Sequence, residues 1–437
     1  MSHRRLVCPG LLRPGLVRLG LITCLVGLTG LAAAGAGDLD ALDVQIGKAL
    51  FKRAWVPAPA STTADDGLGP LFDARSCAAC HPRDGRATLT VSPNGEVEGR
   101  GVVLALARPD GSGDPVYGRR FQVDAVPGIT PEGLLTVRWD RHDPRGPRPV
   151  PVPADLGYGP LAADTGLSLR VAPDLRGRGQ IEEVPEAAIL AIAAEQAAGK
   201  DGVKGEPRRV RTPDGRNVLG RFGWKAAQPS LEAQSSEAFF LDLGMSTSLH
   251  PEPWGDCTPA QVACRAAPHG ISSEKEVEIP DVILQRVTAY VASLEVPSAA
   301  PSANGAGVTG AGVTSAAAKG AAVFAATGCA MCHRPALPLR NGGTAPLFTD
   351  LLLHDMGPGL ADTITEPGAR ATQWRTAPLA GIADALTWNT GLLHDGRAAG
   401  IAEAIAWHDG EARTAVNRFK ALRPKDQAAL IAYVAGL

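Results

Sequence analysis

The sequence lacks any marked excess of charge of either sign, and beyond residue 36 it lacks any long apolar run. Its 437 residues include 43 Lys and Arg against 45 Asp and Glu, which gives a net charge of −2 at pH 7. Nucleic acids and acidic membranes attract strongly basic surfaces, so no such partner is expected. No segment after residue 36 is apolar for long enough to span a membrane. The length allows two or three domains with cores of their own.

Residues 1–36 are typical of a secretory signal peptide. Four arginines lie between positions 4 and 18, an apolar run follows at 19–31, and small residues at 32–36 offer a cleavage site. The apolar run is short for a membrane span, so an uncleaved anchor is the alternative. The sequence therefore predicts an exported protein that contacts a membrane only through this leader, if the leader stays uncleaved.

Cysteine and histidine are scarce, with eight Cys and nine His in the whole chain. Four of the cysteines nevertheless fall in two five-residue segments, 77–81 (CAACH) and 329–333 (CAMCH). Both read Cys-x-x-Cys-His, the attachment sequence of c-type haem. In that chemistry the two thiols form thioethers with the haem and the following imidazole binds the iron. The predicted attachment residues are Cys77, Cys80, Cys329 and Cys332, and the predicted iron ligands are His81 and His333.

Two other readings of these segments are weaker. A redox Cys-x-x-Cys pair would not need histidine at the fifth position of both copies. A zinc site could pool the four cysteines, but the pairs are about 250 residues apart, far from the usual spacing. We therefore predict two covalently bound c-type haems. Because such haem is ligated outside the bacterial cytoplasm, this agrees with export and predicts a periplasmic location.

Cys257 and Cys264 remain as a close pair. In an exported protein such a pair most often forms a disulfide. Closing so short a loop stabilises a protein by roughly 2–3 kcal/mol in the chain-entropy model. A redox-active pair is the alternative, but it lacks the tight Cys-x-x-Cys spacing that lowers the pKa of a thiol.

The order helix, haem motif, terminal helix occurs twice. Helical patterns at 44–51 and 318–324 precede the two motifs, and patterns at 280–294 and 424–437 follow them. This is the plan of a small cytochrome c domain used in tandem. We expect a mainly α fold with a first cytochrome c-like domain at 37–296, a flexible Ala, Gly, Ser and Pro linker at 297–317 and a second domain at 318–437.

The first of these domains is much the longer. Short apolar segments at 101–107, 134–137 and 167–171, bounded by Pro, Gly and Asp, predict strands of a large β-containing insertion. Residues 186–197 predict a helix.

Five further segments carry a resemblance to a known family. They are 67–77 (GLGPLFDARSC), 219–226 (LGRFGWKA), 351–357 (LLLHDMG), 374–379 (WRTAPL) and 393–397 (LHDGR). They resemble the bacterial di-haem c-type oxidoreductases, peroxidases or thiol oxidoreductases that are distantly related to di-haem cytochrome c peroxidases and MauG-type enzymes. The resemblance implies a periplasmic enzyme with one reaction-centre haem and one electron-relay haem. It also implies an electron-donor protein, such as a cytochrome, and a small oxidant such as peroxide.

A di-haem electron-transfer cytochrome without catalysis of its own is the alternative. The large insertion argues against it, because electron transfer alone needs little more than a haem in a small shell. The chain also departs from the family at two places. It has DLGM at 242–245 where the family tends to have DMGI, and one acidic residue, Asp201, where members often have an Asp-rich loop. Calcium prefers six to eight oxygens, so we predict none at 199–205.

The sixth ligand of the second iron has four candidates, His354, Met356, His394 and His408. His408 shares the apolar face of a short helix with Ile401 and its neighbours, and a core histidine is the plain alternative. The resemblance adds that relatives carry the second-haem ligand fourteen residues after the His of the His-Asp-Gly motif, and counting from His394 reaches His408. We expect coordination by His333 and His408, with Met356 second.

Two arginines near these ligands have a predicted part in haem binding. Arg375 and Arg397 are expected to neutralise haem propionates through charge-assisted hydrogen bonds, although each could equally be a solvated surface side chain.

For the first iron, Met245, His142, His250 and His269 all stay possible as sixth ligands. The resemblance implies an open or easily vacated position there. Glu182 is the candidate acid or base for peroxide cleavage. A glutamate at a helix start, favoured by the helix dipole, is its plainer interpretation.

Two tryptophans are candidates for an aromatic relay between the haems. Trp224 and Trp374 each lie beside a cation in a family-like segment, although burial for packing explains either one alone.

Overall fold

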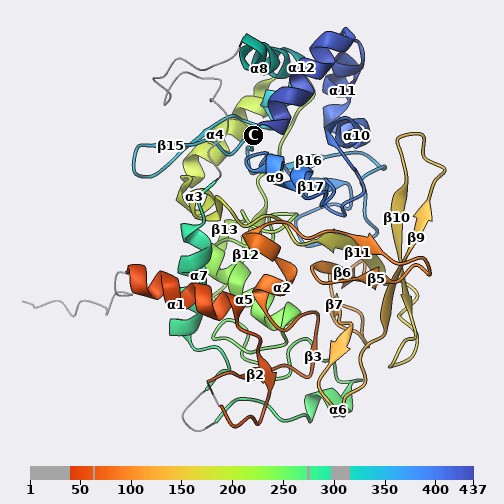
Figure 1. Ribbon diagram of the computed structural model, residues 1–437, viewed down its shortest axis with the longest axis vertical. Coiled ribbons are helices and arrows are strands. Elements are labelled where there is room, and N and C mark those ends of the chain that lie inside the picture. The colour runs from red at the N-terminus through yellow and green to blue at the C-terminus, as the bar shows by residue number, and fades with distance from the viewer. Residues whose placement is uncertain (1–39, 63, 273–275, 297–314) are drawn as a thin grey trace, which may run out of the picture. The chain divides into compact units, whose positions relative to one another are not determined.

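The computed structural model describes residues 40–62, 64–272, 276–296 and 315–437. The predicted signal peptide and most of the predicted linker lie outside these residues. More of the described chain is helical than extended, and its strands form several small sheets (Figure 1). Within the described ranges, no helix is long and apolar enough to cross a membrane.

The helices are α1 (Ala41–Lys52), α2 (Cys77–Cys80), α3 (Arg178–Glu183), α4 (Glu186–Ala198), α5 (Leu231–Asp242), α6 (Val262–Arg265), α7 (Asp281–Ser293), α8 (Ser315–Thr327), α9 (Ile382–Thr387), α10 (Ile401–Trp407), α11 (Arg413–Lys420) and α12 (Pro424–Ala435). Polar caps explain several of their starts. The Asp40 carboxylate accepts hydrogen bonds from the backbone N–H groups of Leu42 at 2.7 Å and Asp43 at 3.0 Å, and so begins α1.

The strands are β1 (Val56–Pro57), β2 (Asp66–Leu68), β3 (Leu71–Phe72), β4 (Thr90–Val91), β5 (Val97–Glu98), β6 (Val102–Ala107), β7 (Arg120–Phe121), β8 (Asp124–Ala125), β9 (Leu134–Asp140), β10 (Arg148–Ala154), β11 (Gly166–Val171), β12 (Arg209–Arg211), β13 (Asn217–Leu219), β14 (Leu337–Pro338), β15 (Thr344–Ala345), β16 (Leu353–Asp355) and β17 (Gln373–Arg375). β6, β9 and β11 occupy the three segments for which the sequence predicts strands. β6 pairs antiparallel with both β11 and β7, and β9 and β10 form a long antiparallel hairpin.

Two helix pairs of the molecule repeat one packing arrangement. α1 lies against α7, and α8 lies against α12 (Figure 1). A Cβ atom added to Gly47 of α1 would stand 1.9 Å from the Arg286 carbonyl oxygen of α7. One added to Gly320 of α8 would stand 2.5 Å from the Ala429 carbonyl oxygen of α12. Glycine therefore lets the backbones of both pairs approach to a distance that no side chain allows.

The aromatic contacts of the two pairs repeat as well. Phe51, one turn after the glycine of α1, packs edge-on against Tyr290 of α7 with ring centroids 5.3 Å apart. Phe324 of α8 does the same with Tyr433 of α12 at 5.7 Å. Each pair thus builds one wall of an apolar core next to a haem motif, and the two walls use the same residue types in the same positions.

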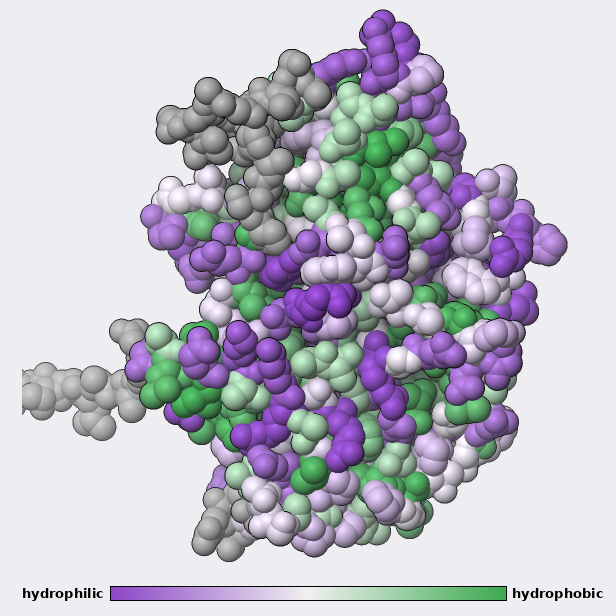
Figure 2. Space-filling view, viewed as in Figure 1, coloured by the Kyte–Doolittle hydropathy of each residue, from purple (hydrophilic) through white to green (hydrophobic). Residues whose placement is uncertain are grey.

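A disulfide joins Cys257 and Cys264, whose Cα atoms are 6.2 Å apart. It ties the loop before α6 into a small buried cluster with Leu71 of β3. At the surface, hydrophilic and hydrophobic residues are interspersed over the face drawn in Figure 2. The described chain exposes large apolar side chains singly, on different elements, as is usual for a globular protein.

Candidate functional site

The first Cys-x-x-Cys-His segment forms the single-turn helix α2 and the residue after it. Ser76 begins the turn, its hydroxyl oxygen accepting the backbone N–H of Ala79 at 3.2 Å. Nδ1 of His81 lies 2.9 Å from the carbonyl oxygen of Pro173 and 3.3 Å from that of Gly85. Because Nδ1 donates to these carbonyls, Nε2 carries the lone pair that an iron ion needs.

A cavity of about 1030 Å³ opens beside this segment. The helix α5 and the strands β6 and β11 contribute to its wall, and Cys77, Cys80 and His81 lie in it. Apart from His81, the described residues that line it include no histidine and no methionine. The candidate sixth ligands of the first iron, His142, Met245, His250 and His269, are therefore all outside this cavity lining.

Helix α5 supplies the polar groups of the larger cavity. Gln234 and Glu237 lie one turn apart on it and both line the cavity. The Glu237 carboxylate contacts Nε2 of His250 at 3.0 Å and the Arg119 guanidinium at 3.1 Å. Burial opposes ionisation of Glu237, but these two partners outweigh it and lower the pKa of the carboxyl.

Glu182, the acid or base candidate from the sequence, is not among the residues that line either cavity. Its carboxylate accepts the backbone N–H of Leu231 at 2.7 Å, which satisfies a free donor at the start of α5. Burial raises the pKa of Glu182 above its ordinary value. In this structure the side chain caps the start of α5.

The second Cys-x-x-Cys-His segment brings His333 and His408 together. Nδ1 of His333 donates to the Phe348 carbonyl oxygen at 3.1 Å, and Nδ1 of His408 donates to that of Ala404 at 2.7 Å. Their ring centroids are 6.5 Å apart. Two metal–imidazole bonds of about 2 Å and the two ring radii add up to roughly 6 Å, so the separation of the rings matches that of two imidazoles bound to one iron ion. Burial lowers the pKa of both imidazoles, that of His333 to about 4, which keeps them in the neutral form that binds metals.

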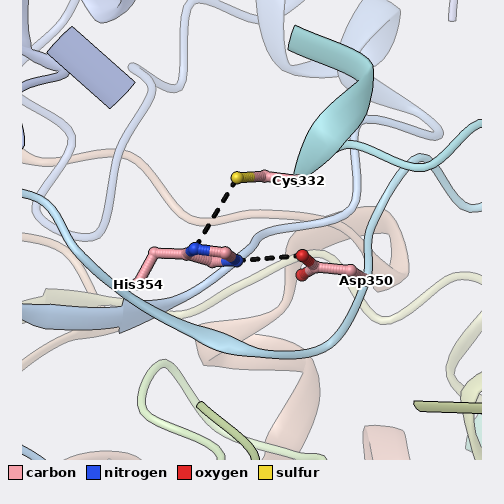
Figure 3. A group of neighbouring side chains, drawn as sticks. All are labelled: Cys332, Asp350 and His354. Carbon is pink, nitrogen blue, oxygen red and sulfur yellow. Dashed lines mark hydrogen bonds and ion pairs between the residues drawn. The ribbon is translucent and has the colours of Figure 1, made fainter. Parts of the chain in front are cut away.

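His354 is held by ion pairs at both ring nitrogens. Nε2 contacts the Asp350 carboxylate at 2.9 Å and Nδ1 contacts that of Glu411 at 2.8 Å. Burial alone would lower its pKa, but the hydrogen bonds with Asp350, Cys332 and Glu411 raise it well above the ordinary value. Figure 3 shows Cys332, His354 and Asp350 side by side. A doubly hydrogen-bonded imidazolium has no lone pair to offer, so we interpret the cluster as an ion-pair network and not as a metal site.

The remaining two ligand candidates, His394 and Met356, line a second cavity of about 280 Å³ together with His333 and His408. His394 stacks on Trp374 with ring centroids 3.7 Å apart, and burial lowers its pKa to about 3. Among the described residues, Met356 forms no hydrogen bond with His333. The imidazole of His408, in contrast, lies with its ring centroid 6.5 Å from that of His333.

Three buried arginines in the wall of the smaller cavity form no ion pair with a carboxylate of the described chain. They are Arg86, Arg178 and Arg375. Arg375 donates only to the carbonyl oxygens of Gly223 and Thr376, both at 3.0 Å. Nε of Arg86 has no hydrogen-bond partner among the described residues. Burial lowers the pKa of Arg86 to about 10 and that of Arg375 to about 9. A buried guanidinium without a counter-ion is costly, so this wall fits an anionic group such as a haem propionate.

Arg397, the other predicted propionate partner, is not in the lining of either cavity. It forms a bidentate ion pair with Asp395, with Nη2 at 2.6 Å, and donates through Nη1 to the Gly359 carbonyl oxygen at 2.8 Å. The sequence analysis missed Arg86 and Arg178. Arg86 lies five residues after the first haem motif, a position that could have drawn attention to it; Arg178 gives no such signal.

The two cavities share part of their lining. Pro173, Arg178, Trp224 and Arg375 belong to both. The Trp224 indole N–H donates to the Val171 carbonyl oxygen at 2.9 Å, which fixes the ring in this shared wall. Trp374, the other relay candidate, lines only the smaller cavity, and the Lys225 ammonium lies 4.3 Å from its ring centroid.

Comparison with known proteins identifies the family. The model of the family described as "Di-haem oxidoreductase, putative peroxidase" matches residues 31–100 and 160–437. No curated protein matches the chain. Among solved structures, hydrazine synthase of Kuenenia stuttgartiensis is 16% identical with a TM-score of 0.35, covering 97% of this chain and 100% of that one. The di-haem peroxidase BthA of Burkholderia thailandensis is 16% identical with a TM-score of 0.39, covering 91% of this chain and 86% of that one.

The family model covers most of the chain, so the protein belongs to the di-haem oxidoreductase family. It is an oxidoreductase of peroxidase type, and the family implies two haems. The residues of the two cavities fit two haems. His81 and His333 have free Nε2 atoms, His408 lies close to His333, and buried arginines have no counter-ion among the described residues.

Proposed function

We propose that this protein is a periplasmic di-haem peroxidase whose first haem is the reaction centre and whose second haem is an electron relay. The haems would be attached at Cys77 and Cys80 and at Cys329 and Cys332. The observation that carries the proposal is the difference between the two cavities. The smaller one brings His408 opposite His333, whereas the larger one offers no histidine or methionine opposite His81. When bound, the first haem supplies an iron position that peroxide can reach, and the second supplies a saturated electron-transfer centre.

The protein's own residues have separate tasks in this proposal. Arg375 and Arg178, which line both cavities, and Arg86, which lines the smaller one, bind propionates. Trp224 is the aromatic group between the haems, because it belongs to both linings. Arg397 does not bind a propionate in this proposal. It pairs with Asp395, whose carboxylate lies 3.7 Å from Nε2 of His394.

In the larger cavity, residues of α5 accept and donate protons. Glu237 lines the cavity and is kept ionised by His250 and Arg119, so its carboxylate can accept a proton from an incoming peroxide. Gln234 adds an amide group one turn earlier. Glu182 lies outside the lining, and we give it the role of fixing the start of α5.

The repeated helix pairs support the proposed division of the chain into a first cytochrome c-like domain at 37–296, a linker at 297–317 and a second domain at 318–437. Export through the leader at 1–36 belongs to the same proposal. So does the absence of calcium at 199–205, where Asp201 lies 3.8 Å from the Arg418 guanidinium. The electron donor is a protein such as a cytochrome, and the oxidant is a small molecule such as peroxide.

Exogenous ligands distinguish this proposal from a pure electron carrier. We expect the purified holoprotein to bind cyanide when ferric and carbon monoxide when ferrous at one haem per chain, and to reduce hydrogen peroxide with a reduced cytochrome or dye as donor. Absorption titration and stopped-flow kinetics give the stoichiometry and the turnover. A holoprotein that binds neither ligand and shows no turnover is an electron-transfer cytochrome, and the peroxidase proposal is then wrong.

The sixth ligand of the second haem is tested by His408→Ala. Loss of the imidazole should convert the low-spin signal of that haem to a high-spin one and open it to carbon monoxide, because His408 is the group that faces His333. The matched control is Met356→Leu, which removes the runner-up thioether and should leave the signal unchanged. Electron paramagnetic resonance and absorption spectra report both variants. If the two results are exchanged, Met356 is the ligand.

A further inference from the structure

Trp407, the residue directly before His408, lies against two arginines. Arg397 is ten residues away in the sequence, and Arg145 comes from a distant segment. The Trp407 side chain is fully buried. The Arg145 guanidinium lies 4.6 Å from its ring centroid and the Arg397 guanidinium 4.5 Å. Both arginines also contact Gly359: Arg397 donates to its carbonyl oxygen, and a Cβ atom added there would stand 2.1 Å from Nη1 of Arg145. Cation–aromatic contacts strengthen as the cation is desolvated, and here Arg397 is buried while Arg145 is partly exposed.

Arg145 belongs to the turn of the β9–β10 hairpin, and this turn lies directly on α10. A Cβ atom added to Gly146 would stand 2.8 Å from Oε1 of Glu403 and 3.7 Å from Nε1 of Trp407. Glu403 in turn accepts the backbone N–H of Ala399 at 2.9 Å, near the start of α10. The hairpin turn therefore contacts α10 at both ends of the helix.

The Arg145 side chain is itself held in place. It forms a bidentate ion pair with Asp143, with Nε at 2.8 Å and Nη2 at 2.5 Å. The hydrogen bonds from Arg145 lower the pKa of Asp143 to about 2, so the pair stays charged at any physiological pH.

The orientation of His408 depends on the turn that these contacts fix. His408 is the C-cap of α10, with extended backbone angles of φ −67° and ψ 129°. Its Nδ1 donates to the Ala404 carbonyl oxygen one turn earlier, and this bond leaves Nε2 free and holds the ring 6.5 Å from that of His333. Any movement of Trp407 out of its site would rotate the last turn of α10 and carry the imidazole with it.

We propose that Arg145 is a positioning residue for the second haem: the β9–β10 hairpin clamps Trp407 and thereby keeps His408 in place as the sixth ligand. This rests on the His408 ligation proposed above. The hairpin lies between residues 100 and 160, the one internal stretch that the family model does not match. The clamp is therefore a feature of this chain's own insertion, and it lets the part of the chain that follows the first haem motif control the ligation of the second haem.

The clamp is tested in the holoprotein by Arg145→Ala, with Arg148→Ala as the matched control. Arg148 lies on the same hairpin but pairs with Asp140 at 3.5 Å and has no contact with Trp407. We expect Arg145→Ala to give a mixture of low-spin and high-spin second haem, and to raise the affinity of that haem for carbon monoxide at least tenfold. Arg148→Ala should match the wild-type protein. Electron paramagnetic resonance gives the spin states and carbon monoxide titration of the reduced protein gives the affinity.

Gly359→Ala is a second route to the same effect. It keeps Arg145 but places a methyl group where the guanidinium lies, so the same mixture of spin states should appear even if Arg145→Ala fails to fold. Arg145→Lys keeps a cation near the ring and should restore most of the low-spin signal.

The proposed clamp is overturned if Arg145→Ala and Gly359→Ala keep the wild-type spectrum while His408→Ala loses it. The ligation of the second haem by His408 would still stand in that case. Equal shifts in Arg145→Ala and Arg148→Ala also overturn it, because they indicate a general loosening of the hairpin. An unchanged spectrum in His408→Ala removes both the ligation and the clamp.

Discussion

Replacing both Cys77 and Cys80 by alanine should lower peroxide turnover at least about 100-fold, to the background rate. Without the two proposed thioethers the first haem would not be retained beside the larger cavity, whose described lining offers no histidine or methionine besides His81. Under the proposed ligation the second haem would not take over, because His333 and His408 would both bind its iron. Haem content should fall from two to one per chain, and the low-spin spectrum of the remaining haem should be unchanged.

The converse variant is the control for this experiment. Replacing Cys329 and Cys332 by alanine should also abolish turnover with a protein donor, because the relay is lost. It should nevertheless leave the first haem able to bind cyanide and carbon monoxide. If the Cys77 and Cys80 variant keeps its turnover, the assignment of the reaction centre to the first haem is wrong. If both variants lose exogenous ligand binding, the two sites are not separate in function.

The parts of the site that follow from sequence are those encoded in neighbouring residues. The Cys-x-x-Cys-His spacing predicts both attachment segments without knowledge of the fold. The apolar periodicity of α10 places His408 at the end of a helix, and the resemblance singles it out. The structure then brings its ring to 6.5 Å from that of His333. Arg397 and Asp395 are two residues apart, so their ion pair could also have been read from the sequence.

The parts that do not follow from sequence depend on contacts between distant segments. Arg86 and Arg178 read as ordinary polar residues in the sequence, whereas Arg375 is predicted as a propionate partner. Only the packing shows that all three are buried without a counter-ion among the described residues. Glu182 looks like a free carboxylate until Leu231, from a segment far along the chain, donates to it. The contact of Arg145 with Trp407 has the same character, since neither residue carries a local signal for the other.

The fold shows the same division. The helices α1, α7, α8 and α12 follow from repeated patterns in the sequence. Their pairing, with Gly47 and Gly320 at the crossings, is seen only in the structure. The strands of the insertion follow from short apolar segments. Their pairing into small sheets, and the contact of the β9–β10 turn with α10, are long-range and have no pattern in the sequence that predicts them.

Glu366→Gln should lower the free energy of unfolding by about 3 kcal/mol at pH 7. The Glu366 carboxylate, whose side chain is 14% exposed, lies between Arg170 at 2.5 Å and Arg208 at 2.8 Å. Burial opposes its ionisation, but the two guanidinium groups outweigh burial and lower the pKa of the carboxyl to about 2. A neutral amide leaves the buried Arg208 and the partly buried Arg170 without that charged partner. A shift from the ordinary value of about 4.3 to about 2 corresponds to about 3 kcal/mol, in agreement with the loss expected.

The pH dependence of this variant gives the sharper test. Because the pKa of Glu366 is lower in the folded protein than in the unfolded chain, its contribution is complete above pH 4.3 or so and disappears as the pH falls toward 2. The difference between wild type and Glu366→Gln in denaturant unfolding should therefore shrink between pH 5 and pH 3, through protonation of the wild-type carboxylate. Glu183→Gln is the control: Glu183 pairs with Arg340 at 3.4 Å on the surface, where ion pairs contribute less than about 1 kcal/mol. A difference that stays constant from pH 7 to pH 3 would mean that Glu366 stabilises the fold through the shape of its side chain, because a charge-dependent contribution must follow the titration of the carboxyl.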